Sequence, residues 1–328
     1  MQKENLNWAV LGVGVIANEM AQALRKMGKT LYSVGNRTHE KAVAFAEKYG
    51  VQKVYDKIDD MFHDDNVDII YITSPHNTHF NFMRQALNNG KNIFVEKSIT
   101  LNSRELNEMI SLAREKNLIL AEAMTIWHMP LYKKLWQIVK SGELGKVQII
   151  TMNFGSFKEY NMNNRFFNMN LAGGAMLDIG VYALSVVRSF MDEKPTEILS
   201  QWKPSPTGSD EQATILLKNS LGQMATAALS MHSKQPKRAI ISCEKGYIEI
   251  MEYPRADKAT IVDAATDEVV HVADGERANA LYYEMLDMEN AVRTGDISEM
   301  KLEFTKDVMD IMTTLRKSWK MQYPNEKW

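Results

Sequence analysis

The sequence predicts an α/β protein in which a doubly wound parallel sheet is followed by an α+β domain with an open, mostly antiparallel sheet. In residues 1–123, short apolar runs alternate with amphipathic helical patterns, a repetition typical of parallel sheets covered on both faces. In residues 124–328 the strand-like segments are longer, alternate more and are separated by turn signals, as in antiparallel sheets. We therefore expect two domains, 1–123 and 124–328.

The first domain is expected to contain five buried strands, each an apolar run. The helical patterns between them end near Gly or Asn, which commonly terminate helices. The expected strands are residues 8–13, 31–36, 67–73, 92–96 and 118–123.

The second domain is expected to pair its strands mainly with antiparallel neighbours. Its strand-like segments are residues 146–157, 197–204, 213–220, 222–233, 238–252, 258–265 and 268–274. Helical patterns cover residues 129–145, 173–191, 279–295 and 305–319.

Bulk composition limits the classes of function. The formal net charge of −2 argues against a broad nucleic-acid surface. Cys243 is the one cysteine, so neither an internal disulfide nor a multi-cysteine metal framework can form, and we expect no metal. The N-terminus lacks the apolar core of a secretion signal, and no segment approaches the roughly 18 apolar residues of a membrane helix. We expect a cytoplasmic protein without a membrane partner.

The turn after the first strand carries a dinucleotide-binding pattern. Gly12, Gly14 and Ala17 form G-x-G-x-x-A, in which the first glycine permits a tight turn and the second lets the backbone approach a pyrophosphate. Val15 and Ile16 begin the helix whose free amides would face the phosphates. The alternative is a plain tight turn.

The end of the second strand bears on the choice of cofactor. A carboxylate there would accept from the adenosine ribose and disfavour a 2′-phosphate. This chain has Asn36, Arg37 and Thr38 instead, and a guanidinium can grip a phosphate through two hydrogen bonds. The sequence favours NADP over NAD, unless Arg37 is only a solvated loop charge.

Two further strand ends supply polar residues to the edge where open α/β sheets bind ligands. After the third strand come Ser74, Pro75, His76 and Asn77, and at the end of the fourth are Glu96 and Lys97. His79 begins the next helix and is either a cofactor contact or a cap or packing residue. Lys97 either faces a site or is a solvated residue at the sheet rim.

Several stretches together resemble the Gfo/Idh/MocA oxidoreductases, nearest the branch of dimeric dihydrodiol dehydrogenases and glucose–fructose oxidoreductases. They are AVLGVGVIA, NRTHEKAVAFAEKYG, TSPHNTH, VEKSIT and GGAMLDIGVYAL. The resemblance implies a Rossmann domain that binds NAD(P), and a carbinol or carbonyl substrate between the two domains. The sequence departs from the family pattern at Ser98, where proline is usual, and at Trp127, where the branch often has arginine.

The resemblance matches the family's EK lysine with Lys97 and its second-domain pair with Asp178 and Tyr182. Asp178 and Tyr182 are four residues apart on a predicted helix, which places them on one face. Tyr182 could transfer the hydroxyl proton, Lys97 could polarise the oxygen, and Asp178 could orient one of them. The alternatives are a half-buried aromatic residue for Tyr182 and a solvated charge for Asp178.

Four residues are weaker candidates for substrate contacts: Trp127, His128, Tyr160 and Arg165. The favoured function is an NADP-dependent dehydrogenase or reductase of a sugar, polyol or dihydrodiol-like substrate. The alternatives are an NAD-linked inositol or aldose dehydrogenase and a non-catalytic dinucleotide and sugar sensor. Because an apolar sheet face must be covered, we expect a homodimer or higher homo-oligomer formed through the second domain.

Overall fold

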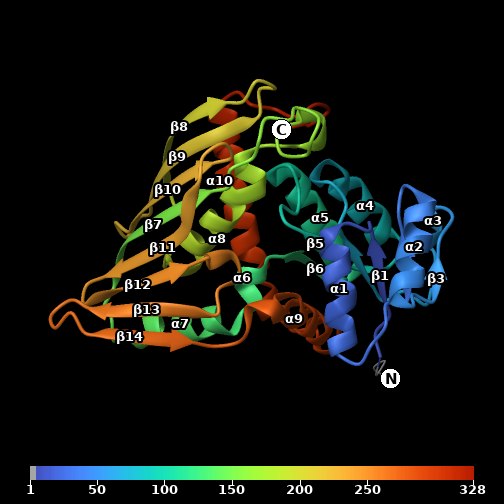
Figure 1. The fold of residues 1–328 in the computed structure, drawn as a ribbon, viewed down its shortest axis with the longest axis horizontal. Helices are drawn as coiled ribbons and strands as arrows, with labels where there is room; N and C mark the ends of the chain where they lie inside the picture. Colours follow the sequence, from blue (N-terminus) through green and yellow to red (C-terminus); the bar gives the residue numbers. More distant parts are fainter. Residues whose placement is uncertain (1–4) are drawn as a thin grey trace. The chain divides into compact units, whose positions relative to one another are not determined.

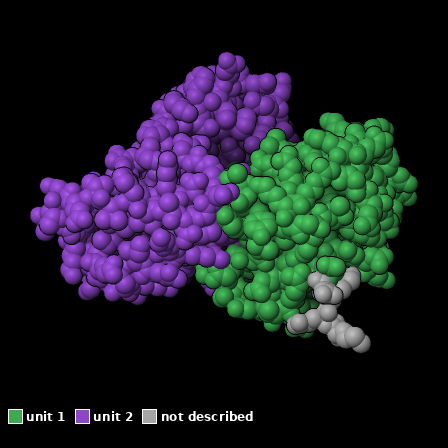
Figure 2. Space-filling view, turned by 60° about the horizontal axis from the view of Figure 1, so that its bottom comes forward, with its two compact units in different colours: residues 1–100, 104–124, 278–302 green, residues 101–103, 125–277, 303–328 purple. Residues whose placement is uncertain are grey.

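The structure, a computed structural model, describes residues 5–328 and contains both predicted sheets (Figure 1). The chain forms two compact units, coloured separately in Figure 2. Unit 1 comprises Met1–Thr100, Arg104–Met124 and Ala278–Leu302, and unit 2 comprises Leu101–Ser103, Thr125–Arg277 and Glu303–Trp328.

Unit 1 is built on a parallel sheet with the strand order β3-β2-β1-β4-β5-β6. This confirms the predicted doubly wound arrangement. The strands are β1 Trp8–Leu11, β2 Ser33–Gly35, β3 Lys53–Val54, β4 Ile69–Ile72, β5 Asn92–Glu96 and β6 Leu120–Ala123. Sequence analysis missed β3, because it has only two residues and begins with an exposed lysine.

The helices of unit 1 follow the strands in alternation. Their bounds are α1 Val15–Lys26, α2 His39–Tyr49, α3 Ile58–Phe62, α4 His76–Asn88, α5 Ser103–Lys116 and, late in the chain, α9 Ala280–Thr294. The 3-10 turns Arg277–Asn279 and Ser298–Met300 flank α9.

The position of α9 differs from the single boundary expected at residue 123. This helix packs with α1 (Figure 1). The buried Glu289 of α9 accepts a hydrogen bond from Trp8 Nε1 at 3.0 Å and one from Lys29 Nζ at 2.6 Å. These partners are 281 and 260 residues away in sequence, so no local pattern indicates them.

Unit 2 is built on an eight-stranded sheet with the order β14-β13-β12-β11-β7-β10-β9-β8. It is mostly antiparallel, as predicted, with β7 and β10 as a parallel pair. The strands are β7 Val147–Gly155, β8 Glu197–Pro204, β9 Asp210–Lys218, β10 Met224–Ser230, β11 Gln235–Cys243, β12 Gly246–Met251, β13 Lys258–Asp263 and β14 Val269–Ala273.

Helices cover one face of this sheet. The helix α8 packs on β7, β10 and β11, and Figure 1 shows α7, α8 and α10 on the same side of the strands. The bounds are α6 Thr125–His128, α7 Pro130–Ser141, α8 Val181–Phe190 and α10 Leu302–Ser318, with short helical turns at Met169–Leu171, Met176–Gly180 and Tyr253–Arg255.

The other face of the sheet carries exposed side chains. In β9, buried residues alternate with exposed ones from Glu211 to Lys218, the pattern of a sheet packed on one face only.

One segment of unit 2, Met169–Phe190, is long and apolar enough to cross a membrane. This corrects the expectation that no such segment exists. It is weak evidence for a membrane span, because 78% of the tested window is buried inside the protein, as in a core helix.

Candidate functional site

The turn from β1 into α1 has the geometry that its glycines predict. Gly12 adopts φ +104°, a conformation that side chains other than glycine rarely adopt. A Cβ at Gly12 would lie 2.8 Å from Thr73 Oγ1, so only glycine fits beside the end of β4. Ala17 is fully buried where the helix meets the sheet.

The N-terminus of α1 is open toward solvent. Gly14 is the N-cap and has no side chain, and a Cβ built there would meet no atom within 4 Å. Val15 is 76% exposed, Ile16 is half-buried, and the first turn contains no acidic residue. Free amides at such an end favour an anionic ligand, so this part of the chain fits the pyrophosphate of a dinucleotide.

The residues after β2 form a short exposed segment. Asn36 Nδ2 donates to the Thr38 carbonyl at 2.9 Å, and Thr38 is the N-cap of α2. Arg37 is exposed and makes no ion pair with any carboxylate of residues 5–328. Its guanidinium is therefore available to an added anion.

The ends of β4 and β5 are joined through a histidine. His76 Nε2 donates to the Lys97 carbonyl at 2.9 Å, and Ser74 Oγ lies 2.7 Å from Thr78 Oγ1. Pro75 and Asn77 are exposed beside His76. The structure thus brings together at one sheet edge the residues that were predicted there.

His79 has a different role from the cofactor contact expected of it. Its ring is fully buried, with Nε2 2.8 Å from the Ser74 carbonyl and Nδ1 3.1 Å from the Ser98 carbonyl. Burial lowers the pKa of His79, although both hydrogen bonds oppose that change. His79 therefore links the loop at Ser74 to the loop at Ser98 through hydrogen bonds to their carbonyls, as the packing alternative predicted. Its ring does not face a ligand.

The Lys97 backbone is fixed on both sides. Tyr71 Oη donates to the Glu96 carboxylate, and the amide of Ile99 donates to the buried Glu122 at 3.0 Å. The peptide bond from Lys97 to Ser98 is cis. The half-buried Lys97 therefore starts from a well-anchored loop at the carboxyl end of β5.

In unit 2, Asp178 and Tyr182 lie on one continuous helical segment that begins as a π-helix and continues as an α-helix. Residues Met176–Gly180 form a π-helical turn, and Tyr182 lies in the first turn of α8. Short π-helical stretches within α-helices are frequent at functional sites. The expected single α-helix over 173–191 is thus replaced by this combination.

Asp178 and Tyr182 have different surroundings. The Asp178 side chain is 16% exposed, and its Oδ1 lies 4.0 Å from Arg165 Nη2, whose side chain is 65% exposed. The half-buried ring of Tyr182 lies 6.3 Å from the ring of Phe154. The structure therefore brings Arg165 and Asp178 together.

Tyr160 is held in a separate group of polar and aromatic side chains. Its hydroxyl donates to Glu211, and its ring stacks on His232 at 3.9 Å. The hydrogen bond to the Glu211 carboxylate raises the pKa of Tyr160. The Tyr160 hydroxyl therefore keeps its proton and donates it in a hydrogen bond to Glu211.

Trp127 and His128 occupy the interior rather than a surface pocket. Trp127 is fully buried, with its ring 6.5 Å from Trp136 and 5.7 Å from Phe304, and His128 is 1% exposed. The expectation that they contact substrate does not fit this packing, because an aromatic cluster surrounds Trp127.

Asp210, which sequence analysis missed, packs against Gly174, one of the two glycines that precede Asp178. It is fully buried, and its Oδ2 accepts a hydrogen bond from the Met176 amide. A Cβ at Gly174, where φ is +135°, would lie 2.0 Å from Asp210 Oδ1. Burial raises the pKa of Asp210 to about 7. The partners are 34 residues apart, so the sequence gives no local signal.

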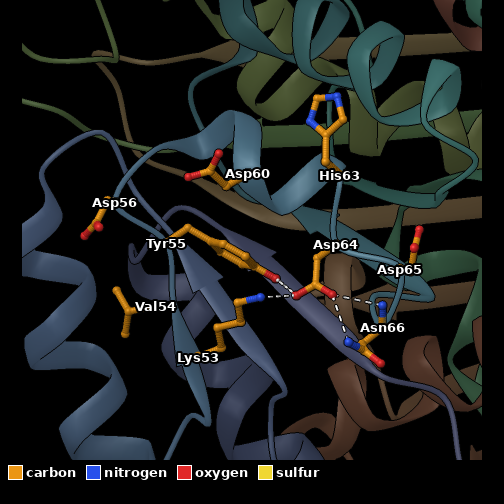
Figure 3. A pocket seen from close by; sticks show the side chains of 9 residues that line it. All are labelled: Lys53, Val54, Tyr55, Asp56, Asp60, His63, Asp64, Asp65 and Asn66. Carbon is orange, nitrogen blue, oxygen red and sulfur yellow. Dashed lines mark hydrogen bonds and ion pairs between the residues drawn. The ribbon is translucent and has the colours of Figure 1, made fainter.

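Asp64 is one of the residues that line a pocket of about 560 Å³ in unit 1 (Figure 3). Lys53 Nζ, Tyr55 Oη and Tyr32 Oη all donate to Asp64 Oδ2, and Lys91 Nζ donates to its carbonyl. Burial opposes the charge, but the hydrogen bonds from Lys53, Asn66 and Tyr55 to the carboxylate hold the pKa of Asp64 below its usual value. Since Tyr32, Lys53 and Lys91 lie at the starts of β2, β3 and β5, the cluster ties strands together.

Comparison with known families covers both units. Residues 6–124 match the family model described as "Oxidoreductase family, NAD-binding Rossmann fold", and residues 132–249 match the "GFO/IDH/MocA C-terminal domain". Among curated proteins, the trans-1,2-dihydrobenzene-1,2-diol dehydrogenase of Xenopus laevis is 30% identical over 260 residues, 78% of each chain. The enzyme of the same name from Mus musculus is 25% identical over 335 residues, 98% of this chain and 99% of its own.

Two solved structures share the fold. The 3-ketoreductase KijD10 from Actinomadura kijaniata, in complex with TDP-benzene and NADP in an open conformation, has a TM-score of 0.81 and 19% identity over 94% of this chain and 96% of its own. Levoglucosan dehydrogenase, in complex with NADH and levoglucosan, has a TM-score of 0.87 and 16% identity over 98% and 99%.

Proposed function

Because the chain belongs to the Gfo/Idh/MocA oxidoreductase family, we propose that it is an NADP-dependent enzyme that interconverts a carbinol and a carbonyl in a sugar, polyol or dihydrodiol-like substrate. The observation that carries this proposal is the position of three chemical groups on regular elements of the fold. Lys97 ends a strand of the nucleotide-binding sheet, and Asp178 and Tyr182 share one helical segment.

The relatives support the substrate class. The curated relatives are named as dehydrogenases of a cyclic diol, and the two solved structures named above are a ketoreductase and a dehydrogenase of levoglucosan. All of these names describe oxidation of a hydroxyl group or reduction of a carbonyl group.

The protein's own residues would position the substrate and move its proton. When bound, the nicotinamide supplies or accepts the hydride. Tyr182 would exchange the proton of the substrate hydroxyl, for which a positioned acid or base is required. The Lys97 ammonium would stabilise negative charge on the reacting oxygen. Asp178 would orient one of these groups.

The function is tested by a substrate screen. Aldoses, polyols, inositols and diols are incubated with the purified protein and either NADP⁺ or NAD⁺, the reduced cofactor is followed by its absorbance, and binding of both cofactors is measured by fluorescence titration. Turnover with one class supports the proposal. Turnover with NAD⁺ alone would favour the NAD-linked alternative, and tight cofactor binding without any turnover would favour a sensor.

The cofactor preference rests on Arg37. We expect Arg37→Ala to weaken NADPH binding roughly tenfold to a hundredfold, because a charge-assisted hydrogen bond contributes about 1.5–3 kcal/mol. NADH binding should barely change, since NADH lacks the 2′-phosphate. Fluorescence titration with both cofactors measures this.

The matched control for Arg37→Ala is Arg84→Ala. Arg84 is also exposed but lies on α4, where its guanidinium stacks on Phe80 at 5.3 Å. Arg84→Ala should leave both affinities unchanged. Equal losses of NADPH and NADH affinity in Arg37→Ala would show that Arg37 does not read the 2′-phosphate.

We also propose that the open face of the unit 2 sheet is covered by a second copy of the chain. Strand register places Leu199, Leu216, Thr226, Thr151 and Ile240 in one row across five strands. Leu199 and Leu216 are 66% and 49% exposed. A contiguous face of this kind is a common site of association.

Leu216→Glu is therefore expected to convert a dimer or larger oligomer into a monomer, because a carboxylate would be desolvated at the interface. Light scattering over a dilution series gives the mass. Leu286→Glu, which alters a 39% exposed leucine of α9, should leave the mass unchanged. A monomeric wild-type protein would refute the proposed assembly.

A further inference from the structure

The C-terminal tail of the chain takes part in a buried polar network in unit 2. We call this network the C-terminal clasp: it consists of Arg316 from α10, Tyr323 and Glu326 from the tail, and Asp210 from β9. All four are nearly or fully buried. The mechanism proposed above uses none of them.

The centre of the clasp is a two-pronged ion pair. Arg316 Nη1 donates to Glu326 Oε2 at 2.8 Å, and Nη2 donates to Glu326 Oε1 at 2.6 Å. The amide of Tyr323 also donates to Glu326 Oε2 at 3.0 Å. Both charged side chains are completely shielded from solvent, so this ion pair links the tail to α10 out of reach of water.

One side of the clasp holds the segment that follows Lys97 in the chain. Arg316 Nη2 donates to the Leu101 carbonyl, and Asn102 Nδ2 donates to Glu326 Oε1 at 2.8 Å and to the Lys327 carbonyl at 3.0 Å. Leu101 is four residues after Lys97.

The other side holds the segment that precedes Asp178 and Tyr182. Tyr323 Oη donates to the Gly173 carbonyl at 3.0 Å, and Asp210 accepts from the Met176 amide. The space at Gly174 is filled by the Asp210 carboxylate. The start of the π-helical turn is thus tied to the tail and to β9.

Stability alone is a poor explanation for this arrangement. A buried ion pair is often no more stabilising than apolar side chains of the same volume, because both charges must be desolvated. What the clasp provides is directional hydrogen bonds to the backbone of two segments. In the chain, one of these segments follows Lys97 by four residues, and the other directly precedes Asp178 and Tyr182.

We propose that the C-terminal clasp is a positioning device for the reaction, in which Tyr323 and Asp210 set the placement of the helical turn that carries Asp178 and Tyr182. This inference rests on the proposed function. Neither Tyr323 nor Asp210 touches the substrate; each acts through the backbone of Gly173–Met176.

The test compares two tyrosines that each donate one buried hydrogen bond to a backbone carbonyl. Tyr323→Phe removes the bond to Gly173, and Tyr132→Phe removes a 2.8 Å bond from α7 to the Tyr253 carbonyl. We expect Tyr323→Phe to lower kcat about tenfold with little change in the KM for NADPH, since misplacement of a reacting group can cost up to about a hundredfold. Tyr132→Phe should keep kcat within about twofold.

A substitution of Asp210 and a measurement of hydrogen exchange cover the cases in which Tyr323→Phe does not fold or no substrate is found. If Tyr323→Phe fails to fold, Asp210→Ala, which removes the acceptor of the Met176 amide, takes its place and should show the same fall in kcat. If the wild-type protein turns over none of the substrates, the proposed function fails, and hydrogen exchange decides the clasp. Amides of residues 173–182 should then exchange faster in Tyr323→Phe than in Tyr132→Phe. Equal kcat or equal exchange in the two variants overturns the inference.

Discussion

Tyr182→Phe and Lys97→Met are each expected to lower turnover by about 10²–10⁴, the usual contribution of a positioned acid or base. Phenylalanine keeps the ring 6.3 Å from Phe154 but has no proton to exchange. Methionine keeps an unbranched side chain on the loop anchored by His76 and Glu122 but has no charge. NADPH affinity should change little in Tyr182→Phe. Steady-state rates with the substrate found in the screen give the result.

The double variant distinguishes a joint role from two separate ones. If Tyr182 and Lys97 act on the same proton and oxygen, the double variant should lose much less than the product of the two single losses. Near-normal turnover in Tyr182→Phe would remove the tyrosine from the chemistry and leave Lys97, Asp178 or His76 to carry it. Tyr247→Phe serves as the control, since Tyr247 is an exposed tyrosine on β12.

The largest effect on stability is expected from Arg316→Met, which should lower the free energy of unfolding by about 3–5 kcal/mol. The substitution leaves Glu326 as an uncompensated charge in a site with 0% exposure. It also removes the hydrogen bond to Leu101. Urea denaturation followed by tryptophan fluorescence measures the loss.

Two further variants provide unfolding free energies with which that of Arg316→Met is compared. Lys218→Met breaks the pair with Glu197 at 3.0 Å, in which the side chains are 47% and 64% exposed, and should cost at most about 1 kcal/mol. Adding Glu326→Leu to Arg316→Met should recover part of the loss, because the unpaired charge is gone. A cost for Arg316→Met as small as that of Lys218→Met would show that the ion pair contributes little.

The parts of the fold that depend on local sequence were predictable. The buried strands β1, β4, β5 and β6 are continuous apolar runs, so residues 8–13, 67–73, 92–96 and 118–123 indicate their positions. The turn at Gly12 is similarly local, since its φ of +104° requires glycine. The membership of α9 in unit 1 depends on Glu289 meeting Trp8 and Lys29, which no sequence window contains.

The same distinction applies to the site. Asn36, Arg37 and His76 lie next to strand ends, so their position in the chain predicts their edge of the sheet. Trp127 and His79 could be placed near the site by position, but their burial depends on partners elsewhere in the fold. Asp210 and Tyr323 meet the glycine segment from 34 and 150 residues away, so they become visible only in three dimensions.

The late return of α9 to unit 1 has a consequence for how the protein is made. A ribosome would release residues 1–124 long before Ala280–Thr294 has been synthesised. Until then Trp8 Nε1 and Lys29 lack their partner Glu289, and the surface of α1 that packs against α9 stays uncovered. The nucleotide-binding unit is therefore completed only when nearly the whole chain has emerged, and until then its uncovered surface is open to association with other chains.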